Sequence, residues 1–418
     1  MGFFFTLVFL FLIYVRPMEW WGPLIGVRVL DYTAGIALTA VFLEGKIGGG
    51  RFKLSPLMWL VPLFWVTITF SWVANAWTQG VIDAFSQFAP VAVAFFLVSI
   101  TVDTMGKFKT LLWFLVLLVA FLSVQAILQF YTGMSLGDQT LFIRGDRIQA
   151  RGIGIFADPN DLALNLVALV PFVLPAFHRG LMSRGMTTGI ILMIPIISGI
   201  VFTRSRGGLL GMAAVAWAYM HQRIGKSVAS IMAAGLLFIM IAVVPRMGEI
   251  NTGESSARAR LDHWSAGLQL FKIHPLFGVG WNDFTSYHDH TAHNSFILVL
   301  AECGFAGAVV WIGLFIAAFR DLKLAETMPR PPPYLHTLIG ALKACLIGWL
   351  VCAFFLSQTY KFTSFLIFGL IVALLNVLRG EGFEVDNAWS ARLSGYTVLA
   401  TVGAVAFMYV AVLVLWRV

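Results

Sequence analysis

Long apolar runs separated by short polar segments recur along the whole chain, and this pattern predicts its architecture. Most runs approach the roughly 20 residues that a helix needs to cross a lipid bilayer. A chain in lipid must satisfy its own backbone hydrogen bonds, which favours helices as the spanning elements. We therefore expect an all-α integral membrane protein in which residues 1–418 form a single polytopic domain with about 12–13 transmembrane helices. The expected spans cover residues 2–15, 27–43, 56–75, 81–101, 109–131, 159–177, 187–203, 207–220, 227–245, 293–319, 335–357, 361–378 and 395–416.

Composition supports the membrane assignment and excludes an ordinary soluble domain. Hydrophobic residues make up 59% of the chain and charged residues 11%, whereas a soluble domain carries about 25% charged residues. The three cysteines, Cys303, Cys345 and Cys352, lie inside apolar runs, where free cysteine behaves as a small hydrophobe. They indicate neither a disulfide framework nor a metal site. The first run lacks a basic leader segment and a small-residue cleavage site, so we expect a retained helix rather than a cleaved signal.

The distribution of Lys and Arg predicts the orientation of the chain in the membrane. Short loops such as "GKFK" and "HQRIGK" are rich in cations, and such loops prefer the cytoplasm, which places the N-terminus inside. The predicted outer segments carry Arg, with only Lys272 and Lys361 as exceptions. Because the guanidinium fork suits phosphate oxygens, this basic outer face predicts anionic partners there. Arginines that merely extend to lipid headgroups are the alternative.

Two predicted outer loops are long, and they cover residues 132–158 and 246–292. The second contains "ESSARARLDHWSAGLQLF", whose apolar residues fall at helical spacing, with Ser255 or Ser256 as a capping residue. We expect an amphipathic helix that lies on the membrane surface. Its tryptophan would serve as an interfacial anchor, and Arg260, one turn earlier, belongs either to that interfacial face or to a binding site.

Arginines also stand at the outer ends of other predicted helices. Arg204 and Arg206 in "FTRSRGGLLG" lie where two apolar runs meet. A charge near membrane depth is costly unless it has a partner or faces a wet cavity, so both are candidate binding residues, with an ordinary loop as the alternative. In "RGIGIFADPNDLALN", Asp158 before Pro159 indicates a helix N-cap. Arg151 in the same segment could face the same outer cavity.

Three histidines precede a long apolar run in "HDHTAHNSF". His288, His290 and His293 could ligate a divalent metal, because His-x-His spacing is workable. No acidic residue accompanies them on a regular helical face, so we expect no metal site. His293, which with Asn294 begins the apolar run, could instead accept a proton from a hydroxyl, because the pKa of imidazole lies close to ambient pH. A purely structural histidine is the alternative.

The histidine segment and three other segments resemble the motifs of a known family. "AHNSFILVLAECGFAGA" is similar to the His-Asn, Glu-x-Gly and Gly signature of the bacterial O-antigen ligase and polymerase superfamily, whose members handle polyprenyl-pyrophosphate-linked glycans at the periplasmic face. "RLDHW" with "HPLFGVGWNDF", "SRGG" and "GIFADPNDLA" resemble further motifs of that family and occur in the same order. The motif-bearing region covers residues 151–310.

The resemblance implies roles for individual residues. Arg206 and Arg260 would bind the donor pyrophosphate, and His293 would be the base that activates the acceptor hydroxyl. No metal and no other cofactor is implied, and the chain contains no phosphate-binding glycine loop of the kind that ATP-dependent enzymes use. Weaker candidates for the same site are Arg151, Arg204, Arg258, His290, Asn294 and Glu302.

The resemblance also implies a reaction and its location. We expect an O-antigen ligase-type glycosyltransferase that transfers a glycan en bloc from undecaprenyl pyrophosphate to a hydroxyl of lipid A core oligosaccharide, with inversion and without a metal. Its partners would be this donor, a lipid A core or lipid-linked glycan acceptor, and membrane lipids, but no nucleic acid. The enzyme would lie in the bacterial inner membrane with its active site facing the periplasm.

Other functions are compatible with the same residues. A polymerase of O-antigen or exopolysaccharide repeat units, or a protein O-glycosylation ligase, would apply the same chemistry to a different acceptor. A flippase or transporter of lipid-linked oligosaccharides would bind substrate through the arginines without reacting. The halves of the chain show no evident repeat and the polar groups gather on one face, so we favour an enzyme. We further expect Arg206, Arg260 and His293 to lie close together.

Overall fold

The computed structural model describes residues 1–45, 55–137, 139–144, 147–156, 158–177, 185–243 and 253–415. Parts of both expected outer loops, including residues 246–252, lie outside the described residues. The α-helices are α1 (Gly2–Val15), α2 (Val29–Leu43), α3 (Leu57–Ala74), α4 (Thr78–Thr101), α5 (Met105–Thr132), α6 (Pro159–Leu169), α7 (Gly185–Thr203), α8 (Arg206–Ile224), α9 (Lys226–Val243), α10 (Gly253–Ile273), α11 (Phe284–Tyr287), α12 (Ser295–Glu326), α13 (Leu335–Ala353), α14 (Phe362–Gly380) and α15 (Ala391–Leu415). The short elements are the 3-10 helices η1 (Pro17–Glu19), η2 (Gly22–Leu24) and η3 (Val170–Phe177) and the strands β1 (Phe142–Arg144) and β2 (Arg147–Gln149).

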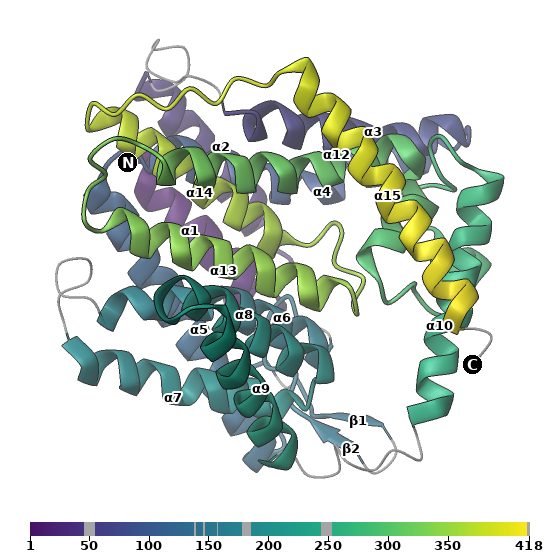
Figure 1. The fold of residues 1–418 in the computed structure, drawn as a ribbon, viewed down its shortest axis with the longest axis horizontal. Helices are drawn as coiled ribbons and strands as arrows, with labels where there is room; N and C mark the ends of the chain where they lie inside the picture. The colour runs from purple at the N-terminus through teal and green to yellow at the C-terminus, as the bar shows by residue number, and fades with distance from the viewer. Residues whose placement is uncertain are drawn as a thin grey trace.

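The fold is that of an all-α integral membrane protein, as the apolar runs predict. Seven of the described helices are both long and apolar enough to cross a membrane: α3, α4, α5, α12, α13, α14 and α15. The shorter helices α1, α2, α6, α7 and α9 are also apolar. Among the seven long helices α14 is the most buried and α15 the least, so α14 forms the centre of the bundle and α15 lies at its edge (Figure 1).

The axes of most bundle helices are roughly parallel or antiparallel to one another, whereas α10 lies across the ends of these helices (Figure 1). We call this end, where α5, α7 and α13 finish and α6, α8, α12 and α14 begin, the site end. Helix α10 packs on α12 and α15 through a small apolar cluster that includes Trp264 and Leu268. The expected amphipathic helix is therefore present. The helix begins at Gly253, so Ser255 and Ser256 lie in its first turn, and neither is the N-cap that the sequence suggested. Serine, which is common at helix starts, fits the first turn as well, where backbone N–H groups have no partner within the helix.

A β-hairpin occupies the first outer loop, a feature that the sequence pattern did not indicate. Strands β1 and β2 pair antiparallel, with Ile143 opposite Ile148. After β2 the Ala150 N–H donates to the Phe202 carbonyl at 3.1 Å, and the Gln149 side chain donates to the Thr203 carbonyl at 2.7 Å. These hydrogen bonds hold the hairpin against the end of α7, just before Arg204 and Arg206.

Helix α12 is broken near its start. Gly304 has a φ of 63°, and a Cβ at this position would lie 2.4 Å from the Leu276 carbonyl carbon, so only glycine fits. The break frees carbonyls that the preceding loop uses: the Val279 N–H donates to Ala301 at 2.9 Å, and the Gly280 N–H donates to Glu302 at 3.1 Å. The Glu-x-Gly sequence thus fixes the first two turns of α12 against the loop that follows α10.

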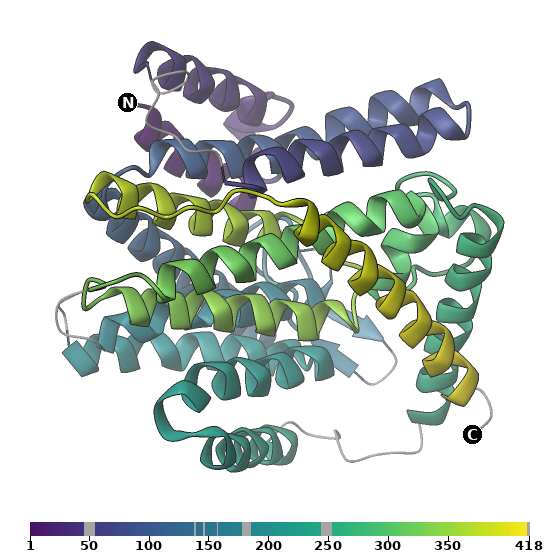
Figure 2. The ribbon, with the colours of Figure 1, turned by 45° about the horizontal axis from the view of Figure 1, so that its top comes forward.

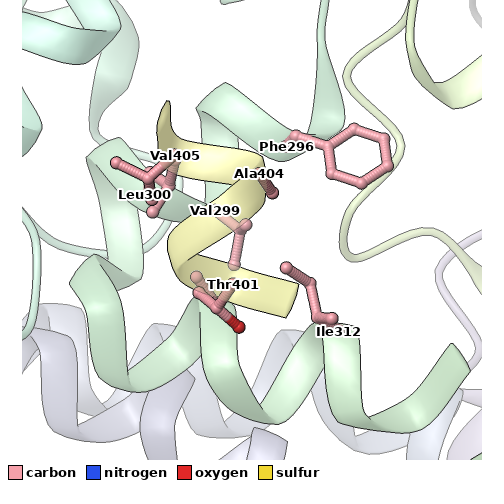
Figure 3. Close-up of a pocket in the computed structure, with 8 residues that line it drawn as sticks. Phe296, Val299, Leu300, Ile312, Thr401, Ala404 and Val405 are labelled. Carbon is pink, nitrogen blue, oxygen red and sulfur yellow. The ribbon is translucent and has the colours of Figure 1, made fainter. Parts of the chain in front are cut away.

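A small apolar crevice lies between α12 and α15 (Figure 3). Its volume is about 10 Å³, which is close to the space of a single water. The lining residues are Phe296, Val299, Leu300, Ala308, Ile312, Thr401, Ala404 and Val405. We interpret it as imperfect packing between two helices rather than as a binding site.

Candidate functional site

The loop that joins α13 to α14, residues 354–361, holds the site end together. The Ser295 hydroxyl at the start of α12 donates to the Leu356 carbonyl at 2.6 Å and accepts from the Gln358 N–H at 2.8 Å. The Thr359 hydroxyl donates to the Ser295 carbonyl at 2.9 Å. We call residues 354–361 the hub loop, because its other side chains contact both the arginine and the histidine segments.

Arg206 and Arg260 meet at the hub loop. The Arg260 guanidinium lies over the ring of Phe355, 5.8 Å from its centroid. A Cβ on Gly207, the residue after Arg206, would lie 3.7 Å from the Phe355 Cβ. Burial lowers the pKa of Arg260, and the neighbouring Arg206 cation lowers it further. The two cations therefore sense each other's charge even though they are 54 residues apart in the sequence.

The arginine pair lacks a local counter-ion. Within the described part of the chain, no carboxylate lies within 4.0 Å of the guanidinium nitrogens of Arg206 or Arg260. Arg206 is exposed, and Arg260 is half-buried. Two neighbouring cations without a carboxylate partner form a favourable site for an anionic ligand such as a phosphate.

His293 is held by the same hub loop. Its backbone N–H donates to the Ser357 hydroxyl at 3.0 Å, and the Thr291 hydroxyl also contacts Ser357. His293 has a φ of 47°, in the left-handed region that residues other than glycine rarely adopt. Such strained positions persist only where their surroundings impose them, and they cluster at functional sites. The half-buried imidazole lies beside the start of α12, next to α10.

His263 connects the histidine and the arginine segments. It lies three residues after Arg260 on α10, and its ring centroid is 5.7 Å from that of His293, 4.7 Å from that of His288 and 5.5 Å from that of His290. Burial, with help from the three neighbouring histidines, lowers the pKa of His263 to about 4, so its ring is neutral at pH 7. Sequence reasoning missed this residue, although its spacing from Arg260 on the expected helix would have placed it nearby.

The histidine cluster has no geometry for a metal ion in the described ranges. No group of three or more His, Cys, Asp or Glu side chains there is arranged to hold one. His290 is exposed and stacks on His263 with an interplanar angle of 9°. It therefore belongs to the cluster through its contact with His263.

Two of the weaker candidates are engaged in structural contacts. Asn294 is fully buried and caps α12, because its side chain accepts from the N–H groups of Phe296 at 2.9 Å and Ile297 at 3.1 Å. Glu302 is 2% exposed, and its carboxylate accepts from the Phe284 N–H at 3.2 Å, which holds the loop after α10. Both fix the position of the histidine segment instead of facing the arginine pair.

The remaining weaker candidates are arginines around the site. The Arg151 side chain donates to the Thr140 carbonyl at 2.9 Å, so it belongs to the hairpin region. Arg204, with a φ of 50°, places its guanidinium 5.4 Å from the ring centroid of Phe130. Arg258 is exposed on α10, one turn or less from Arg260. Of these three, only Arg258 shares a helix with a member of the arginine pair, Arg260.

The Asp-Pro-Asn segment positions Arg206. Asp158 caps α6 as the sequence indicated, because its carboxylate accepts from the Asn160 N–H at 2.7 Å. The Asn160 side-chain oxygen accepts from the Ser205 hydroxyl at 2.7 Å, and Ser205 in turn caps α8 through the Gly208 N–H at 3.1 Å. This chain of caps fixes the N-terminus of α8, whose first residue is Arg206.

Comparison with known proteins assigns this part of the chain to a family. Residues 189–312, from α7 to the middle of α12, match the O-antigen ligase family. The matched segment contains the arginine pair, α10 and the histidine cluster, but not Arg151. No curated protein matches the chain significantly. The family consists of enzymes of the glycosyltransferase-type ligase and polymerase class. The match, together with the all-α membrane fold, supports a relationship of this segment to the O-antigen ligase and polymerase superfamily.

Proposed function

We propose that the chain is an O-antigen ligase-type glycosyltransferase that moves a glycan en bloc from undecaprenyl pyrophosphate to a hydroxyl of lipid A core oligosaccharide. The observation that carries this proposal is the meeting of Arg206, Arg260 and His293 around one loop, inside the segment that matches the family. Such a transfer requires two neighbouring arginines, which here have no carboxylate partner among the described residues, and a histidine held by the same loop.

The arginine pair binds the donor pyrophosphate in this proposal. As the glycosidic bond breaks, negative charge grows on the leaving phosphate oxygens, and two guanidinium groups already in place stabilise it. Removing one oriented donor of this kind typically costs about 10²–10³ in rate. The Arg260 guanidinium lies over the Phe355 ring, 5.8 Å from its centroid, and this contact helps to hold it in place.

His293 acts as the general base. Its imidazole takes the proton from the acceptor hydroxyl, whose oxygen attacks the anomeric carbon while the bond from that carbon to the pyrophosphate oxygen breaks. A single displacement inverts the configuration, and the proton passes from His293 to the released pyrophosphate or to water. General base catalysis typically contributes about 10²–10⁴ in rate. The two arginines supply the positive charge that the step needs, so the proposed reaction requires no metal.

The proposed setting is the bacterial inner membrane, with the site end at the periplasmic face. The Lys-rich short loops predict that the opposite end lies in the cytoplasm, and Lys107 and Lys226 lie at that end. A donor anchored by its polyprenyl chain would bring its pyrophosphate to the level of α10, which lies across the ends of the bundle (Figure 1).

The test is transfer by purified protein in EDTA, from a synthetic undecaprenyl-pyrophosphate glycan to lipid A core. The wild type is compared with His293→Ala, Arg260→Ala and the matched control Arg204→Ala, which deletes the same charge from an arginine that lies over Phe130. We expect product from the wild type and from Arg204→Ala, and almost none from the other two variants.

The other outcomes separate the alternatives. Loss of activity in Arg204→Ala but not in Arg260→Ala would overturn the assignment of the arginine pair. Elongation of the lipid-linked glycan without a lipid A product would replace the ligase by a polymerase, and transfer to a peptide serine or threonine would replace it by a protein ligase. Absence of transfer to every acceptor would contradict the enzyme proposal.

A further inference from the structure

The outward face of α10 carries a depression that the proposed chemistry does not use. Its volume is about 460 Å³, within the range of about 300–1,000 Å³ that is usual for small-molecule sites. Six of its lining residues come from α10 and one, His288, from the segment before α12. Figure 2 shows α10 at one side of the molecule, beside the C-terminal half of α15.

Helix α10 separates two surfaces of different chemistry. Ala259, Asp262, Ala266 and Gln269 recur at spacings of three and four residues, so they share the face that lines the depression. Trp264, on another face, is buried in the apolar cluster that joins α10 to α12 and α15. Asp262 and Gln269 are exposed, and the small side chains of the two alanines leave room beside them for a bound ring.

The lining favours a neutral ligand that is rich in hydroxyl groups. Asp262, Ser265 and Gln269 offer a carboxylate, a hydroxyl and an amide, which together donate to and accept from hydroxyl groups. No lysine or arginine is among the described residues that line the depression, and the Asp262 carboxylate repels phosphate. The arginine pair and the depression therefore select for opposite kinds of ligand.

The depression lies beside His263, whose ring neighbours that of His293. His263 and His288 line it, and the rings of His263 and His293 are 5.7 Å apart. The His263 Nδ1 is buried and has no hydrogen-bond partner in the described part of the chain. A polar atom buried without a partner is costly, so a hydroxyl group bound beside it would satisfy it.

We propose that this depression is the acceptor subsite, which binds a neutral sugar ring of the acceptor glycan and directs one of its hydroxyl groups past His263 to His293. This inference rests on the proposed function, since it names where the second substrate of that reaction binds. The acceptor then reaches His293 from the outward face of α10, while the donor pyrophosphate is bound on the side of the hub loop.

The inference is tested by sugar binding in the absence of donor. The probes are soluble core oligosaccharide, released from lipopolysaccharide by mild acid, and the free repeat-unit oligosaccharide, each titrated calorimetrically into full-length protein in detergent. Asp262→Asn and Gln269→Ala are compared with Asp289→Asn, which makes the same charge change at an exposed residue outside the depression. Loss of one hydrogen bond predicts binding about fivefold weaker for each depression variant, and unchanged binding for the control.

Kinetics distinguish failure of this inference from failure of the proposed function. If the wild type transfers glycan, the depression variants should raise KM for the acceptor and leave KM for the donor unchanged. Transfer with unaltered acceptor KM, or equal sugar binding by all variants, would overturn the subsite and leave the glycosyltransferase intact. Sugar binding that depends on Asp262 in a protein that transfers nothing would support the depression as a sugar site and contradict the enzyme. No binding of either oligosaccharide to the wild type would overturn the subsite.

Discussion

The two ends of the helix bundle differ in whether their charged side chains have partners within the protein. At the end away from the site, the fully buried Asp321 accepts hydrogen bonds from the Ser55 hydroxyl at 2.7 Å and the Asn387 amide at 3.0 Å, and Lys343 pairs with Glu326 at 2.7 Å. At the site end, no carboxylate among the described residues pairs with either member of the arginine pair. The charged groups at the end away from the site thus have partners within the protein, whereas neighbouring cations with no carboxylate partner among the described residues are costly and favour an anionic ligand.

The largest expected effect is on kcat/KM, when a member of the arginine pair is removed. Arg260→Ala should lower kcat/KM by about 10²–10³, because it removes a cation that stabilises the leaving group. Arg260→Lys keeps the charge but loses the two-pronged geometry, so it should restore activity only in part. Steady-state transfer assays check both variants.

The matched control is Lys343→Met, which removes a cation that the protein already pairs with Glu326 at the opposite end. This variant should retain the kcat/KM of the wild type per folded molecule. Equal losses in Lys343→Met and Arg260→Ala would show that the difference between the two ends has no functional meaning.

The second prediction concerns stability at the opposite end. Asp321→Ala should lower the free energy of unfolding, because it leaves the Ser55 and Asn387 donors buried without their acceptor, at a cost of about 1–3 kcal/mol for each. Thermal unfolding of the detergent-solubilised protein measures the change. Activity per folded molecule should stay the same.

An exposed ion pair provides the control for Asp321. Asp31 pairs with Arg28 at 2.6 Å, and both side chains are more than half exposed, so Asp31→Ala should cost less than about 1 kcal/mol. A melting temperature for Asp321→Ala that matches that of Asp31→Ala would contradict the structural role of the buried network.

The sequence predicts the scaffold better than the site. The bundle follows from apolar runs of membrane-crossing length, and the Asp158 cap follows from an acidic residue before Pro159 at the start of such a run. These features are local, so the sequence pattern contains them. The break at Gly304 is also local, but the surrounding run stays apolar and conceals it.

The residues that the sequence does not reveal act through long-range contacts. The hub loop has the sequence "FFLSQTYK", which carries one charged residue, Lys361, and contains no recognisable motif. Its importance arises because Ser357 reaches His293, Phe355 reaches Arg260, and Gln358 contacts Asp161 at the start of α6. Each contact joins segments that are far apart in the chain, so neither helical spacing nor composition can indicate it.

The third prediction concerns the stabilisation of the site end by a bound anion. Inorganic pyrophosphate in EDTA should raise the melting temperature of the wild type, because an anion relieves the repulsion between Arg206 and Arg260 that contributes to the lowered pKa of Arg260. At a concentration about ten times the Kd, the gain in the free energy of unfolding is about 1.4 kcal/mol.

The gain from pyrophosphate should disappear in the double variant with Arg206→Ala and Arg260→Ala, and it should shrink in about 1 M salt because exposed charges are then screened. Stabilisation of the double variant to the same extent as the wild type would mean that the anion binds elsewhere.

The smallest expected effect is the pH dependence of His263. The folded protein lowers the pKa of this residue to about 4, mainly through burial and then through His288, His293 and His290, while Asp262 acts in the opposite direction. In the unfolded chain the pKa is about 6.5. As the pH falls below that value, the unfolded chain binds a proton at this histidine whereas the folded chain does not. The free energy of unfolding that is present at neutral pH is therefore lost progressively toward pH 4.

Replacing His263 with glutamine removes this titration, and the difference in melting temperature between the variant and the wild type should narrow or reverse as the pH falls from 7.5 to 5. His336→Gln at the opposite end is the matched substitution, because it makes the same change at an exposed histidine outside the cluster. If His263→Gln followed the wild type at every pH, the neutral state of the His263 imidazole beside the arginine pair would have to be abandoned.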